Sequence, residues 1–113
     1  MDRERNFQRY RAFMLSRAEI EGAWNAHYFR AFPHECAGKE VDGVCLTSCD
    51  TFLAGCISYF VENGTLDSER RGVVARVCAD LERVMPLLSG DAHRYFSELL
   101  ALGKALEVRA NAR

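Results

Sequence analysis

Apolar residues recur every three or four positions along most of the chain, and this spacing predicts α-helices. The strict alternation that is typical of half-buried strands does not occur. Because the segments between the predicted helices are short, neighbouring helices should run in opposite directions. We therefore expect an all-α fold, a compact antiparallel bundle of four to five helices that forms a single domain over residues 1–113. The predicted helices span about residues 4–15, 17–31, 44–62, 68–87 and 92–108, and residues 33–43 form a connecting loop.

The boundary between the first two predicted helices rests on a capping signal. Ser16 and Glu19 have the spacing of a capping box, in which each side chain bonds the backbone N–H of the other residue. Pro33 ends the second helix, because proline cannot donate the hydrogen bond that continues it. One long helix over residues 4–31 is the alternative. The apolar stripe of the second helix is predicted to consist of Ile20, Trp24, Tyr28 and Ala31.

The other helix ends carry ordinary stop and start signals. Asn63-Gly64 closes the helix over residues 44–62, because glycine readily adopts the left-handed conformation. Thr65 or Asp67 should cap the next helix, and Asp91 the last one.

Composition and charge exclude several classes of function. With 113 residues and 49% hydrophobic residues, the chain can build a core without metals or crosslinks. The 15 Lys and Arg nearly cancel the 16 Asp and Glu, so no global field attracts nucleic acid or an anionic membrane. The polar N-terminus does not resemble a secretory signal, and no stretch approaches the roughly 20 apolar residues of a membrane-spanning helix. We expect a cytoplasmic protein without membrane association.

Three of the five cysteines lie within twelve residues, at positions 45, 49 and 56. On a helix at about 100° per residue they fall within about 40° of one another, on the hydrophobic face, which favours packing as small buried thiols. Metal binding is the alternative, since one histidine and three thiolates match the preferences of zinc. That hypothesis requires no cofactor beyond Zn and uses His34, Cys36, Cys45 and Cys49. Whether Cys45 and Cys49 are core residues or ligands stays open at this stage.

Catalytic patterns are missing from the sequence. There is no glycine-rich phosphate loop, no dinucleotide-binding pattern and no motif surrounding a nucleophilic cysteine. The three histidines, at positions 27, 34 and 93, have no partner at a diagnostic spacing, and His27 is expected at the surface or boundary of its helix. We therefore expect a protein that is not an enzyme.

Aromatic residues give the clearest indication of function, because they crowd the first 32 positions. A small bundle buries one stripe per helix, so part of this aromatic set should form an exposed patch that binds a protein. The sequence predicts a non-catalytic protein–protein interaction module, such as an adaptor, an inhibitor or immunity-type protein, or a regulatory subunit. It would bind a protein partner or form a homodimer. The residues expected to bind the partner are Phe13, Phe29, Phe32, Arg9 and Arg30.

A weaker alternative is nucleic-acid binding through the N-terminal arginines. Arg3, Arg5, Arg9 and Arg11 alternate with aromatic residues, which can stack on bases. The acids at positions 2 and 4 dilute this charge, so a nucleic-acid partner is not favoured.

Overall fold

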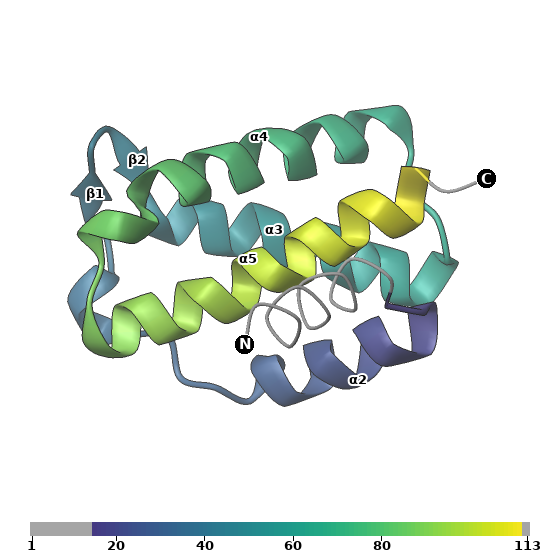
Figure 1. Ribbon diagram of the computed structural model, residues 1–113, viewed down its shortest axis with the longest axis horizontal. Helices are drawn as coiled ribbons and strands as arrows, with labels where there is room; N and C mark the ends of the chain where they lie inside the picture. Colours follow the sequence, from purple (N-terminus) through teal and green to yellow (C-terminus); the bar gives the residue numbers. More distant parts are fainter. Residues whose placement is uncertain (1–14, 112–113) are drawn as a thin grey trace, which may run out of the picture.

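Helices carry most of residues 15–111, the part of the chain that the computed structural model describes (Figure 1). The predicted helix over residues 4–15 therefore lies almost wholly outside the described residues, as do Arg9 and Phe13. Within the described part the α-helices are α2 (Arg17–Tyr28), α3 (Leu46–Asn63), α4 (Ser68–Val84) and α5 (Gly90–Asn111). Short 3₁₀ turns occupy His34–Cys36 and Met85–Leu87, and two short strands are β1 (Glu40–Val41) and β2 (Val44–Cys45).

The capping box that opens α2 is confirmed. The Ser16 hydroxyl accepts from the Glu19 N–H at 3.1 Å, and the Glu19 carboxylate accepts from the Ser16 N–H at 3.2 Å. Ser16 itself has extended backbone angles, with ψ at 166°. A single uninterrupted helix over residues 4–31 is therefore wrong, because the helical path cannot run through Ser16.

The helix α2 ends at Tyr28, three residues before the predicted end at 31. The Arg30 N–H donates to the His27 carbonyl at 2.9 Å, which closes a tight turn and takes the chain out of the helix. Pro33 also disfavours the helical conformation at Phe32, so the chain continues in a non-helical path.

The segment predicted as an irregular loop over residues 33–43 instead holds the first 3₁₀ turn and most of a small hairpin. The strands β1 and β2 pair antiparallel, with Glu40 opposite Cys45 and Val41 opposite Val44. Asp42 and Gly43 form the turn with φ values of 50° and 78°. Positive φ at both central residues is typical of the tight turns that join hairpin strands. The hairpin moves the start of α3 to Leu46.

Glycine and aspartate mark the junction of α3 and α4 as predicted. Gly64 has a φ of 76°, and its N–H donates to the Phe60 carbonyl at 2.7 Å. The Asp67 carboxylate accepts from the Arg70 N–H at 2.8 Å and thereby caps α4.

The start of α5 differs from the prediction. The helix begins at Gly90, so Asp91 lies in its first turn and is not the capping residue. A negative charge in that turn still complements the helix dipole.

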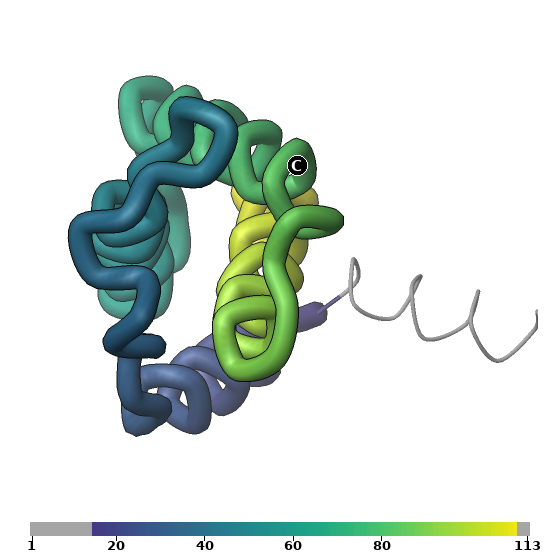
Figure 2. The backbone as a smooth tube through the Cα atoms, turned by 90° about the vertical axis from the view of Figure 1, so that its left-hand side faces the viewer, coloured from purple at the N-terminus to yellow at the C-terminus, as the bar shows by residue number. Residues whose placement is uncertain are grey.

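The described helices pack as an antiparallel all-α bundle, in which α3, α4 and α5 each run opposite to the helix before them (Figure 1). Viewed along their axes in Figure 2, the helices surround one central core. The largest fully buried side chains come from all four helices and are Ile20, Leu46, Leu53, Ile57, Phe60, Val74, Leu81, Val84, Phe96, Leu99 and Leu106. Among residues 15–111, no helix is both long enough and apolar enough to cross a membrane.

Candidate functional site

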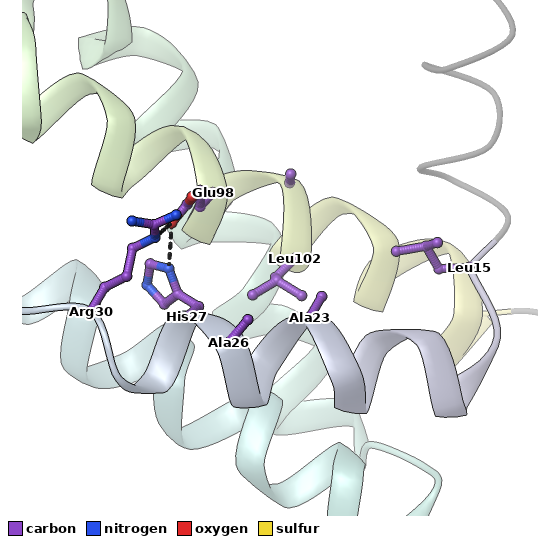
Figure 3. Close-up of a pocket in the computed structure, with 8 residues that line it drawn as sticks. Leu15, Ala23, Ala26, His27, Arg30, Glu98 and Leu102 are labelled. Carbon is purple, nitrogen blue, oxygen red and sulfur yellow. Dashed lines mark hydrogen bonds and ion pairs between the residues drawn. The ribbon is translucent and has the colours of Figure 1, made fainter.

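A buried histidine lies where α2 meets α5. His27 is only 4% exposed, and its Nδ1 lies 3.2 Å from Oε1 of Glu98. The same Glu98 oxygen accepts from Nε of Arg30 at 2.6 Å. Figure 3 shows His27 at the end of α2 and Arg30 just after it, both reaching toward the Glu98 carboxylate on α5. This cluster fixes the end of α2 against α5 and leaves the Arg30 charge compensated.

The burial of His27 corrects the expected position of the α2 stripe. His27 was expected at the surface or boundary, and Tyr28 was expected to face inward. The residues of α2 that are buried are Ile20 and His27, whereas Tyr28 is 68% exposed. Ile20 keeps its predicted inward position, and the hydrogen bond to Glu98 allows the polar His27 side chain to be buried where Tyr28 is not.

A second polar pair connects α3 to α5 beside this histidine. The Tyr95 hydroxyl donates to Oδ1 of Asp50 at 2.5 Å. The ring of Tyr95 lies 4.5 Å from the His27 ring, measured between centroids. Burial raises the pKa of Tyr95, and the hydrogen bond to the Asp50 carboxylate raises it further. The phenol therefore stays neutral and is the donor in its hydrogen bond to Asp50.

Two cavities flank the buried histidine. One is an apolar groove of about 310 Å³ between α2 and α5, lined by small and aliphatic residues together with the charged cluster (Figure 3). The other lies between α2, α3 and α5 and has a volume of about 280 Å³. Its lining is aromatic and polar: Trp24, His27, Tyr28, Asp50, Ala54, Gly55, Ser58 and Tyr95. We call this second cavity the Asp50 pocket.

An exposed group of aromatic side chains lies next to the Asp50 pocket. Phe29 is 85% exposed, and its ring lies 5.5 Å from the Tyr28 ring in an edge-to-face arrangement. Trp24, one turn earlier, is half-buried and lies 5.9 Å from Tyr28. We call Trp24, Tyr28 and Phe29 the α2 aromatic patch. Trp24 and Tyr28 belong to both the patch and the wall of the Asp50 pocket.

The predicted partner-binding residues divide between different places. Phe29 is exposed, whereas Phe32 packs edge-to-face against Tyr95 and Phe96 at 5.5 and 6.0 Å. Arg30 is half-exposed but paired with Glu98. Phe13 and Arg9 lie outside the described residues, as do the other N-terminal arginines of the nucleic-acid hypothesis. Of the three predicted residues that the structure describes, Phe29 is therefore the apolar side chain that is exposed and available for binding.

The four side chains of the zinc hypothesis are not brought together. His34 is fully exposed, Cys36 and Cys49 are buried in the hydrophobic core, and Cys45 is partly exposed. No group of three or more His, Cys, Asp or Glu side chains within residues 15–111 is arranged to hold a metal ion. The geometry therefore gives the zinc hypothesis no support.

All five cysteines lie within the described residues, and each is a free thiol. Burial raises the pKa of the Cys49 thiol to about 11 and also raises the pKa of Cys36, Cys56 and Cys78. Cys45 differs, because the hydroxyl and the backbone N–H of Ser48 at the start of α3 lower its pKa. Cys49 and Cys56 pack in the core as small apolar side chains, as the helical projection indicated, and Cys78 does so from α4. The projection was wrong for Cys45, which lies in β2 before the helix and is partly exposed.

The sequence could not reveal the polar cluster or the Asp50 pocket, because both depend on distant partners. His27 and Glu98 are separated by 71 positions, and Asp50 and Tyr95 by 45. The one local signal is the spacing of Trp24 and Tyr28, which places both side chains on one side of a helix. Comparison of this chain with protein-family models, with curated proteins and with solved structures found no match.

Proposed function

We propose that this chain is a non-catalytic protein-binding module whose contact surface is the α2 aromatic patch. The observation that carries the proposal is the exposure of Tyr28 and Phe29, two adjacent large aromatic side chains at the end of one helix. Aromatic residues are enriched among the side chains that dominate the energy of protein interfaces.

The setting of the patch also favours a preformed contact surface. The His27–Glu98–Arg30 cluster holds the end of α2 against α5, so the patch rests on a fixed element. A rigid aromatic surface loses little conformational entropy when it binds, because each ring has only two side-chain torsions to fix. A partner would gain binding free energy by covering these rings, and the bundle would not have to change its conformation.

Affinity capture with matched variants tests this proposal. Phe29→Ala removes most of an exposed ring and leaves the core untouched. Complete burial of a Phe side chain stabilises a complex by about 1.5–3 kcal/mol, so association should weaken about 10- to 100-fold. The control is Leu87→Ala, since Leu87 is 62% exposed but lies at the 3₁₀ turn after α4.

Two measurements make the outcome specific. Photocrosslinking from a benzophenone amino acid at position 29 should give an adduct of defined mass, and the same probe at position 87 should not. Sedimentation velocity then distinguishes a second copy of this chain from a different protein. Association that is equally strong in the wild type and in Phe29→Ala, with no adduct from position 29, would contradict the proposal.

A further inference from the structure

The Asp50 pocket has the chemistry of a site for an organic cation. Its walls include three aromatic rings, Trp24, Tyr28 and Tyr95, and its charged lining residue is Asp50. A cation beside aromatic faces is attracted by the negative charge density of the rings, and a carboxylate adds a direct ion pair. Among residues 15–111, no Lys or Arg lines this pocket.

Asp50 lacks a cationic partner among the described residues. Its Oδ1 accepts from the Tyr95 hydroxyl, but Asp50 forms no ion pair within residues 15–111. Glu98, which lies nearby on α5, is compensated by Arg30 and His27. The two acids therefore differ: one is satisfied inside the molecule, and the other lies half-buried in a cavity with capacity to accept further hydrogen bonds.

His27 adds an uncommitted buried nitrogen to the same pocket. Its Nδ1 faces the Glu98 carboxylate and so carries the proton, while Nε2 has no hydrogen-bond partner among the described residues. In the neutral imidazole Nε2 is then an acceptor. Buried polar atoms normally have hydrogen-bond partners, so this unpaired nitrogen is an unusual feature of a residue that lines the pocket.

We infer that the Asp50 pocket receives an arginine side chain of the protein that binds the α2 aromatic patch. This inference rests on the proposed function and names the chemistry of the partner. Guanidinium is planar, stacks on aromatic faces, is weakly hydrated and carries five N–H donors, which suits an aromatic pocket rich in acceptors. At about 280 Å³ the pocket falls just below the usual size of small-molecule sites and suits a single side chain.

The shared residues indicate how the partner is arranged. Because Trp24 and Tyr28 belong to both surfaces, an arginine in the pocket would be flanked by apolar residues that cover Tyr28 and Phe29. Arg30, one of the predicted partner-binding residues, is already paired with Glu98, and the unpaired charge among the described residues that line this pocket is negative, which favours a basic contact.

The test uses the full chain and Nα-acetyl-L-arginine amide as the probe. Trp24 is the only tryptophan, so its indole N–H is an unambiguous NMR reporter of the pocket wall. At low ionic strength the probe should shift this signal saturably. The matched control probe is Nα-acetyl-L-citrulline amide, which has nearly the same shape without the charge, and it should bind at least about 10-fold more weakly.

Two matched variants then test whether the charge of Asp50 binds the arginine probe. Asp50→Asn should weaken arginine binding about 10-fold, whereas the amide oxygen can still accept from Tyr95. Glu62→Gln makes the same charge change at an exposed position near the end of α3 and should leave binding unchanged. The citrulline comparison needs only the wild-type chain, so it decides the matter even where Asp50→Asn does not fold.

Several results would overturn the inference. These are the absence of a saturable shift at tens of millimolar probe, equal binding of the arginine and citrulline probes, and equal binding by folded Asp50→Asn. Free zwitterionic arginine that binds 10-fold more tightly than the capped probe would indicate an amino-acid ligand and not a partner side chain. Association that depends on Phe29 without arginine binding overturns this inference alone. Arginine binding without Phe29-dependent association overturns the proposed function and the assignment of the arginine to that partner, and leaves only a pocket that binds guanidinium.

Discussion

Replacing Gly103 with alanine tests how closely α5 packs against α3 and α4. Gly103 is buried in α5, and a Cβ atom at this position would lie 2.6 Å from Sγ of Cys78 and 3.1 Å from Cδ2 of Leu53. The first separation is far shorter than a normal contact between these atoms. Alanine can be accommodated only if side chains of two neighbouring helices shift.

The expected magnitude is the sum of two opposing terms. Alanine in a helix interior is favoured over glycine by about 0.8–1 kcal/mol, whereas overpacking a core costs about 1–3 kcal/mol. Gly103→Ala should therefore lower the free energy of unfolding by about 0–2 kcal/mol. Gly72→Ala isolates the first term, because Gly72 is exposed in α4 and its added Cβ would have no atom within 4 Å. That control should raise the free energy of unfolding by about 0.5–1 kcal/mol.

Urea denaturation followed by circular dichroism measures both variants. The two free energies should differ by about 1–3 kcal/mol, with the Gly103 variant the less stable. Combining Gly103→Ala with Cys78→Ala removes the colliding sulfur, so the two substitutions should couple favourably by more than about 0.5 kcal/mol. If Gly103→Ala stabilises the protein as much as Gly72→Ala does, the close approach of the helices described above is wrong.

Three further predictions concern buried polar groups and thiols. Glu98→Ala should destabilise the fold by about 1–3 kcal/mol, because it leaves Nδ1 of buried His27 without a partner. Arg30→Ala should cost less than about 1 kcal/mol, since the Arg30–Glu98 pair is half-exposed. Equal losses of the free energy of unfolding in urea denaturation would contradict these different roles. Burial raises the pKa of Cys49 from the ordinary 9.0 to about 11 in the folded chain. The stability that depends on this thiol should therefore be fully present below pH 9 and should fall by about 1–3 kcal/mol, after allowance for solvent screening, as the pH rises from 9 to 11. Cys49→Ala should flatten that part of the pH profile. Cys45 is partly exposed and has a lowered pKa, so brief treatment of the native chain with iodoacetamide should alkylate Cys45 before the other thiols. Peptide mass mapping measures the order of labelling. Uniform labelling of all five thiols would contradict this prediction.

The helices could be predicted from the sequence because their signals are local. The Ser16–Glu19 capping box and the glycine after Asn63 lie within one turn of the ends that they define. The hairpin over residues 40–45 was missed although Asp42-Gly43 is a typical hairpin turn. Its strands have only two residues each, which is too short for an alternating pattern to be visible.

The inward face of α2 could not be predicted, because hydrophobic periodicity does not count histidine as a buried residue. The apolar spacing of Ile20, Trp24 and Tyr28 predicts one inward face, and the sequence alone does not favour the observed face, which buries Ile20 and His27, over that prediction. Only the partner on α5, contributed 71 positions later, makes burial of His27 favourable. The exposure of Tyr28 follows from that choice, and so does the existence of the α2 aromatic patch.

The two carboxylates near His27 show why a net charge of −1 says little about recognition by this chain. Glu98 accepts hydrogen bonds from His27 in α2 and from Arg30 just after that helix, so its charge serves the attachment of the end of α2 to α5. Asp50 accepts from a neutral phenol, so its charge remains uncompensated within the described residues. A carboxylate in a cavity with aromatic walls is screened less by water than an exposed one, and its attraction for a cation is correspondingly stronger. The proposed arginine contact therefore involves Asp50 and not Glu98, because the hydrogen bonds within the fold already satisfy Glu98.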